Sequence, residues 1–250
     1  MLKNKPVLFS LNVNKIALLR NARGEDRPHL CSVIQDCIQF GAQGITVHPR
    51  PDERHIRYSD LQDIKQLLTQ QDQLIEFNIE GYPSTRFLEY IVDIKPDQVT
   101  LVPDAPDALT SNEGWLIQEN KTLLASALNK LKTAGIRTSL FMHPKSTEWA
   151  HLPQLGVDRV ELFTKDYASH YFECPNNAIS SYQKAAKEVA TYGLEVNAGH
   201  DLNQENLAYF VNNIELLKEV SIGHALICEA LYEGLEKTVK SYRALCKRLI

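Results

Sequence analysis

Short apolar runs alternate regularly with amphipathic helical segments along this chain, and this alternation is the feature that most constrains its fold. Runs of this length, following a helical segment and a glycine, are typical of buried parallel strands. The segment 123–131 between two runs has its apolar residues at helical spacing. Eight runs have strand character: 7–13, 44–48, 74–79, 98–102, 138–141, 159–163, 194–197 and 220–223.

The junctions between helical and apolar segments repeat as well. Gly41, Gly135, Gly156 and Gly193 each follow a helical segment and precede an apolar run, where glycine ends a helix in the left-handed conformation. Eight such units in 250 residues favour closure of the sheet over an open doubly wound sheet. We therefore predict an α/β fold, a single (β/α)8 TIM-barrel domain over residues 1–250 with extra helices.

Charge and cysteine usage narrow the class of protein. A formal net charge of −4 argues against a nucleic-acid-binding protein, which would normally carry a basic excess. The five cysteines are odd in number and show no C-x-x-C spacing, which argues against a disulfide framework and a structural zinc site. The apolar stretch after residues 1–5 ends too soon for a signal peptide and is interpreted as the first strand. We expect a protein of the reducing cytosol, with no membrane and no nucleic-acid partner.

Polar residues gather where the predicted strands end. In α/β barrels the carboxyl ends of the strands form the active site. A histidine at a strand end is more often structural than catalytic, but several histidines together with glutamates can move protons in both directions near neutral pH. The residues at these ends are Asn12, Asn14, His48, Arg50, Glu76, Asn78, Pro103, Asp104, His143, Glu161, Thr164, Asn197, His200, Gly223 and His224.

The two glutamates among them are ambiguous from sequence. The two-residue period of a strand places Glu76 either in the barrel lumen or against the helices. A carboxylate that faces the helices would need a partner, so we expect the lumen, where desolvation would raise the pKa of Glu76 toward that of a useful base. Glu161 carries the same ambiguity, with a structural salt bridge as its alternative.

Two loops near the predicted mouth are cationic in a chain that is acidic overall. They carry Lys15, Arg20 and Arg23 in the first loop and Arg50, Arg54 and His55 in the second. Arg20 and Arg23 would share a face of a short helix, where they could also serve the helix dipole. The turn at Gly223 lies where barrels often bind phosphate, after strands seven and eight. These features together suggest phosphorylated ligands.

No pattern supports a metal site, because no histidine and cysteine cluster has ligand spacing. Lys165 follows a predicted strand and could form a Schiff base, although a surface lysine is the commoner explanation.

Four segments in the right order resemble the pyridoxine 5′-phosphate synthase family, and the likeness spans nearly the whole chain. The segments are 12–24 (NVNKIALLRNARG), 44–56 (GITVHPRPDERHI), 196–200 (VNAGH) and 222–225 (IGHA). The resemblance implies a closed (β/α)8 barrel that assembles as an octamer. It implies condensation of 3-amino-2-oxopropyl phosphate with 1-deoxy-D-xylulose 5-phosphate to pyridoxine 5′-phosphate, phosphate and water, with no metal or organic cofactor.

The resemblance also implies roles for individual residues. By motif, His48 and Glu76 would be proton acceptors, His200 a proton donor, and Glu161 a carboxylate that stabilises charged intermediates. The segment 103–115 would be a mobile lid. The substrate-binding positions would be Asn12, Arg23, Gly223 and His224 on the amino-ketone phosphate side and Arg50, His55 and Thr110 on the deoxyxylulose phosphate side.

The chain departs from the better-known form of the family at four positions. That form has Asp-His at Asn14-Lys15, histidine at Phe163 and glycine at Asp201, so we interpret the chain as a branch variant and place Asn14, Lys15 and Asp201 among the substrate-binding residues. Lys15 can meet a phosphate or hydroxyl by charge, but it cannot share a proton near pH 7 as histidine does.

Three alternative interpretations remain at this point. The first is another TIM-barrel phosphosugar enzyme, such as a Schiff-base aldolase that uses Lys165. The second is a non-catalytic barrel that binds a phosphorylated ligand, which would need the arginines but not the acid and base residues. The third treats the segment 225–249 mainly as a partner surface, although its apolar positions more often indicate packing against a barrel wall.

Overall fold

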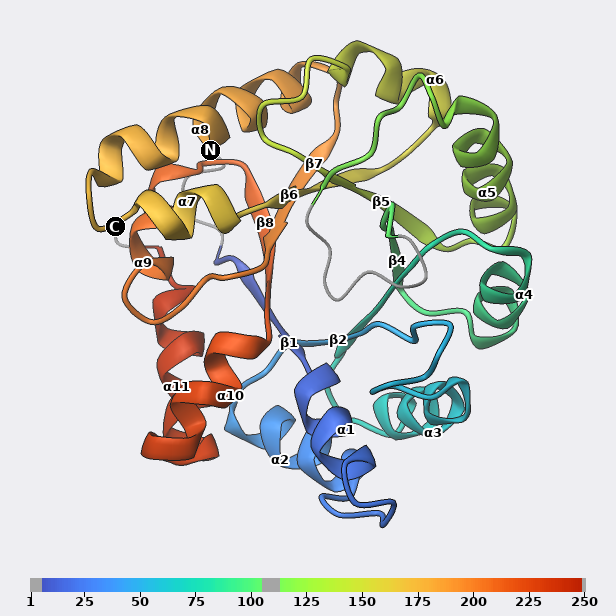
Figure 1. Cartoon of the computed structure of the whole chain (residues 1–250), viewed down its shortest axis with the longest axis vertical. Helices are drawn as coiled ribbons and strands as arrows, with labels where there is room; N and C mark the ends of the chain where they lie inside the picture. The colour runs from blue at the N-terminus through green and yellow to red at the C-terminus, as the bar shows by residue number, and fades with distance from the viewer. Residues whose placement is uncertain (1–5, 105–112, 249–250) are drawn as a thin grey trace.

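The computed structural model describes residues 6–104 and 113–248 and forms one closed barrel of eight parallel strands surrounded by helices (Figure 1). Each strand pairs with the next along the chain, and the first strand pairs with the last. The predicted fold class, a single-domain TIM barrel, is confirmed.

The strands agree with the eight predicted runs to within a few residues. The structure has β1 (Leu8–Asn12), β2 (Gly44–Val47), β3 (Glu76–Gly81), β4 (Gln98–Leu101), β5 (Arg137–Met142), β6 (Arg159–Phe163), β7 (Glu195–Gly199) and β8 (Leu217–Ile222). The largest consequence of a boundary error lies at β3. This strand begins at Glu76 and continues to Gly81, whereas the sequence predicted 74–79.

Helices cover the outside of the barrel. They are α1 (Asn14–Asn21), α2 (Leu30–Phe40), α3 (Tyr58–Thr69), α4 (Thr85–Ile94), α5 (Lys121–Thr133), α6 (Leu152–Leu155), α7 (Lys165–His170), α8 (Pro175–Thr191), α9 (Leu207–Asn213), α10 (His224–Glu233) and α11 (Leu235–Leu245), with a short 3-10 helix at Trp149–His151. The last helical segment, expected as one helix, is two, because Gly234 adopts a φ of 84° between α10 and α11.

The two faces of each strand differ in polarity. On β1, Phe9 and Leu11 belong to the apolar core between sheet and helices, whereas the hydroxyl of Ser10 lies 2.7 Å from that of Thr46 on β2. The lumen therefore contains many polar side chains that bond to one another. Those that are fully or nearly fully buried include Ser10, Thr46, Asn78, Gln98, Thr100, Ser139, Glu161, Asn197 and Glu219.

Candidate active site

A histidine and a carboxylate meet at the carboxyl ends of β2 and β3. His48 directly follows β2, and its Nδ1 lies 3.6 Å from Oε2 of Glu80 near the end of β3. Both side chains are largely buried, at 6% and 14% exposure. At this distance a proton can pass between the two groups through a small movement or one water molecule.

Burial decides where the proton of this pair resides. Desolvation is the largest influence on both groups and disfavours their charged forms. It lowers the pKa of His48, which Arg50 lowers further, and it raises the pKa of Glu80 to about 7. The imidazole is therefore neutral and ready to accept a proton, while the carboxyl can give or take one near neutral pH.

Glu161 lies deeper in the same lumen, on β6. Its Oε2 accepts a hydrogen bond from the hydroxyl of Thr100 at 3.3 Å, and Gly199 on β7 carries no side chain where a Cβ would overlap the Glu161 carboxylate. Desolvation, then the nearby Glu80, raises the pKa of Glu161 to about 8. The sequence left Glu161 ambiguous between the lumen and a structural salt bridge. The structure places it in the lumen, and no ion pair of Glu161 is found among the described residues.

Arg50 and His55 lie beside His48, in the loop after β2. The guanidinium Nη2 of Arg50 lies 2.7 Å from Oδ2 of Asp104 beyond β4, and both residues are buried. The backbone N–H of Ile56 donates to Nδ1 of His55 at 2.9 Å. Desolvation and the neighbouring His48 and Arg50 lower the pKa of His55 to about 3. His55 is thus a neutral imidazole whose Nε2 carries the proton.

The ends of β1 and β8 complete this side of the mouth. The side chain of Asn14 accepts a hydrogen bond from the backbone N–H of His48 at 2.9 Å, and Asn12 accepts one from the backbone N–H of Asn14 at 3.1 Å. A Cβ on Gly223 would lie 3.1 Å from that of Asn12. The glycine therefore allows the backbone before α10 to approach the end of β1, and His224 is the first residue of α10.

His200 stands opposite, directly after β7. Its ring meets that of Phe163 edge-on with centroids 5.1 Å apart, and its Nδ1 lies 3.2 Å from Oδ2 of Asp201. The charge of His200 also favours the ionised form of Glu80, which places the two groups within electrostatic range of each other.

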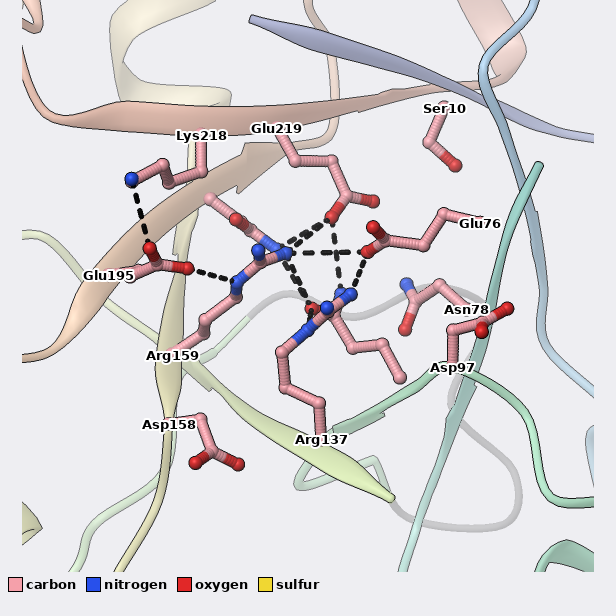
Figure 2. Close-up of polar contacts among 12 residues, drawn as sticks. Ser10, Glu76, Asn78, Asp97, Arg137, Asp158, Arg159, Glu195, Lys218 and Glu219 are labelled. Carbon is pink, nitrogen blue, oxygen red and sulfur yellow. Dashed lines mark hydrogen bonds and ion pairs between the residues drawn. The ribbon is translucent and has the colours of Figure 1, made fainter. Parts of the chain in front are cut away.

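Glu76 does not belong to this cluster, and its expected place at the mouth is wrong. It is the first residue of β3 and pairs in register with Gly44, the first residue of β2. Its carboxylate bonds to Arg137 and lies 3.4 Å from Nη1 of Arg159, at the amino-terminal ends of β5 and β6 (Figure 2). Glu76 thus belongs to a polar network at the opposite end of the barrel.

Figure 2 shows the polar contacts that join the side chains of this network. Arg159 also donates to Gln98 at 2.9 Å and to Glu219 at 3.2 Å, and Asn197 donates to Glu219 at 3.0 Å. Asn197, which we expected near the mouth, therefore reaches toward this end.

The first basic loop differs from its prediction. Arg20 is buried in α1 and binds both carboxylate oxygens of Asp60, at 2.7 and 2.9 Å, so it anchors α1 to α3. Arg23 lies beyond the end of α1 and is exposed, so the two arginines do not share a helical face. Lys15 lies in the first turn of α1, half-buried. Thr110 lies outside the described residues, as does most of the expected lid.

Sequence reasoning missed Glu80. A signal for it was present: in 77–81 (FNIEG) apolar and polar residues alternate, which extends the strand past the predicted end at Ile79 and brings Glu80 to its carboxyl end.

The described residues lack two other kinds of feature. They hold no group of three or more histidine, cysteine or acidic side chains that could bind a metal ion. None of the helices in 6–104 and 113–248 is long and apolar enough to cross a membrane.

The closed barrel, with a buried histidine and carboxylate at the carboxyl ends of its strands, defines the class of TIM-barrel enzymes. Solved structures agree on the fold. A tryptophan synthase structure from M. tuberculosis matches with a TM-score of 0.66 at 12% identity, covering 99% of this chain and 95% of the other. Thiamine phosphate pyrophosphorylase from Pyrococcus furiosus matches with a TM-score of 0.60 at 14% identity, covering 98% of both.

Sequence comparison identifies the family. The family model described as "Pyridoxal phosphate biosynthesis protein PdxJ" matches residues 9–248, and the chain belongs to this family. Pyridoxine 5′-phosphate synthase from Parabacteroides distasonis is 52% identical over 94% of this chain and 97% of the relative. The synthase of the same name from Christiangramia forsetii is 48% identical over 96% and 99%. The resemblance found in the sequence is confirmed, and it decides against the aldolase and the non-catalytic binder.

Proposed function

We propose that this chain forms pyridoxine 5′-phosphate at the carboxyl-terminal mouth of its barrel, from 3-amino-2-oxopropyl phosphate and 1-deoxy-D-xylulose 5-phosphate. The activity follows from its family and from relatives near 50% identity over almost their whole length. The observation that carries the choice of site is the buried His48 and Glu80 pair, in which desolvation leaves a neutral imidazole beside a carboxyl with a pKa of about 7.

The proposed reaction needs several proton transfers, and the lumen holds groups suited to them. The substrate amine attacks the ketone of deoxyxylulose phosphate, and the imine forms with loss of water. Further dehydration follows, phosphate departs from the deoxyxylulose part, and an aldol-type closure gives the aromatic ring. His48 takes protons, Glu80 takes and returns them, and His200 supplies a proton to the leaving oxygen. Glu161, protonated at neutral pH, can donate a hydrogen bond to a developing negative charge. Glu80 thus replaces Glu76 in this scheme.

Two groups of residues are suited to the two phosphates. Asn12, Gly223 and His224 lie together at the ends of β1 and β8, where backbone N–H groups at the start of α10 favour an anion. Arg50 and the Nε2–H of His55 lie on the other side of His48. Asn14 donates its backbone N–H to Asn12 of the first group, and we keep Asn14, Lys15 and Arg23 as substrate-binding candidates.

The test is to mix the purified protein with both substrates in the presence of a chelator and to follow pyridoxine 5′-phosphate by its fluorescence. Product is expected only when both substrates are present, and the chelator should not reduce the rate. A folded protein that forms no product would overturn the proposal, and a rate that falls on chelation would overturn the expectation of metal-free catalysis.

We also propose that the chain acts as a homo-oligomer, an octamer. Two helices that contact each other carry exposed large apolar side chains: Leu18 and Leu19 on α1, and Leu231 and Tyr232 on α10, with Tyr232 94% exposed. Exposed apolar clusters of this kind commonly mark protein interfaces. Light scattering should give eight times the chain mass of 28.4 kDa, and a monomer in dilute buffer would overturn the assignment.

A reducing cytoplasm is the compartment that we propose. All five cysteines lie in the described part of the chain and none forms a disulfide, as is usual in that environment. Thiol titration of protein denatured without prior reduction should count five thiols, whereas three or fewer would indicate an oxidising compartment.

A further inference from the structure

His200 and Asp201 form a pair that the family comparison does not explain. The imidazole Nδ1 and the carboxylate Oδ2 lie 3.2 Å apart, and the two side chains are 29% and 40% exposed. We propose that Asp201 is a positioning residue, which holds the ring of His200 with Nε2 toward the lumen and places its own negative charge on the Nδ1 side. The inference rests on the proposed role of His200 as proton donor.

The backbone brings this pair together at a cost. His200 and Asp201 have φ angles of 81° and 52°, a left-handed conformation that costs non-glycine residues of order 1 kcal/mol each. Thr164 holds the turn by donating its hydroxyl to the carbonyl oxygens of Gly199 and His200, and Asn206 donates to that of Asp201 at 3.4 Å. Two strained residues held from both sides indicate that the turn serves a particular side-chain arrangement.

The surroundings of the ring leave Asp201 as its nearest described carboxylate. Phe163 and Phe141 cover the ring from β6 and β5, with centroids 5.1 and 6.5 Å away. Glu80 on β3 lies within electrostatic range. A carboxylate that accepts the Nδ1–H fixes the tautomer of a histidine and stabilises its charged form.

The electrostatics of Asp201 agree with this geometry. The hydrogen bond with His200 is the largest influence that lowers the pKa of Asp201, and Lys165 and His224 lower it further. The carboxylate is therefore ionised at the pH where the enzyme works, so it can offer a full negative charge to the ring.

The test uses two substitutions of Asp201 and one control. Asp201→Asn removes the charge but keeps an acceptor and tolerates the left-handed backbone, whereas Asp201→Gly removes both charge and acceptor. Asp166→Asn is the control, because Asp166 forms a similar pair with His143, at 3.6 Å, on the same face of the barrel.

With Asp201→Asn, the alkaline limb of the kcat profile should move to lower pH by about one unit, with KM for both substrates changed less than about twofold. Asp201→Gly should also lower kcat at the pH optimum by about tenfold or more, since the ring is no longer oriented. Asp166→Asn should leave the profile in place. An alkaline limb that stays in place in Asp201→Asn, or moves equally in Asp166→Asn, would overturn the inference.

A second readout separates this inference from the role of His200. Diethyl pyrocarbonate modifies unprotonated imidazole, and mass spectrometry of the His200 peptide gives the reaction rate at each pH. The pH of half-maximal rate should fall in Asp201→Asn whether or not His200 is the donor. If this midpoint moves but the kcat profile does not, the pair exists and the donor role fails. If the midpoint stays, the positioning role fails while the synthase activity stands.

Discussion

Glu76 and Glu80 illustrate what decides function at the scale of a residue. They lie four positions apart on β3, so both face the lumen, yet a rise of about 3.3 Å per residue separates them by roughly 13 Å along the strand. One bonds to Arg137 and Arg159 at the amino-terminal end, and the other lies beside His48 at the mouth. The residue type and the face of the strand were predictable from sequence. The level within the barrel depends on where the strand begins and ends, and the apolar run 74–79 misplaced both ends although the alternation in 77–81 indicated the later one.

The substitution Glu80→Gln tests this distinction. It keeps the size of the side chain but removes the proton acceptor, so kcat should fall by about 10²–10⁴, with KM little changed. Steady-state rates of pyridoxine 5′-phosphate formation measure the effect. Glu76→Gln, at the far end of the barrel, should lower stability while the folded enzyme keeps its turnover. Near-normal turnover in Glu80→Gln would remove Glu80 from the mechanism.

The other mouth residues differ in how far sequence could place them. His48 and His200 directly follow a strand, so their position at the rim followed from the strand ends, and the structure confirms it. The ion pair of Arg50 with Asp104 joins residues 54 positions apart. Such pairing depends on the closed geometry of the barrel, which no local pattern contains.

At the scale of elements, the alternation of strand and helix predicted the eight strands, because buried parallel strands and amphipathic helices have different periods. Apolar runs give the wrong strand boundary where apolar residues continue beyond the end of the strand. Leu74 extends the apolar run before β3 but is 87% exposed in the structure, and the polar residues of 78–81 hid the true end of the strand. An error of two residues was enough to select the wrong glutamate.

Close packing at the end of β3 gives a prediction for this element. A Cβ on Gly81 would lie 2.6 Å from Cζ of Phe87, which is buried in α4. Gly81→Ala should therefore reduce the free energy of unfolding by about 1–3 kcal/mol, measured by urea denaturation. In a protein that already carries Phe87→Leu, adding Gly81→Ala should reduce the free energy of unfolding by less than it does in the unmodified protein, because the ring that the new Cβ would meet is gone. If Gly81→Ala unfolds at the same urea concentration as the unmodified protein, β3 and α4 can move apart with no loss of stability, and the prediction is wrong.

At the scale of the whole molecule, the lumen keeps several titratable groups neutral, and this makes stability depend on pH. Burial raises the pKa of Glu161 to about 8 and that of Glu80 to about 7, and it lowers the pKa of His55 to about 3. In an unfolded chain the carboxyls release their protons near about pH 4.3, and histidines near about pH 6.5. The folded and unfolded forms therefore bind different numbers of protons across this range.

The sign of the dependence follows from these differences. As pH falls below about 6.5, the buried histidines reduce the free energy of unfolding. The reason is that these histidines take up protons in the unfolded chain but stay neutral in the folded barrel. Between about pH 6.5 and pH 8 the carboxyls dominate. The folded protein still holds the proton of Glu161, with its pKa of about 8, so this contribution to stability is lost as pH rises through that value.

We therefore expect the free energy of unfolding to fall between pH 6.5 and pH 8, by about 1 kcal/mol per pH unit for a carboxyl that is still protonated in the folded state. Urea denaturation at one protein concentration measures it, because any oligomer makes apparent stability depend on concentration. Glu161→Gln is the matched variant, since a neutral amide of similar size has nothing to titrate. The free energy of unfolding of this variant should fall less steeply with pH than that of the unmodified protein. If the free energies of unfolding of the variant and the unmodified protein fall equally with pH, Glu161 is already ionised at neutral pH. It could then not donate a hydrogen bond to a developing negative charge, and that proposed role would be wrong.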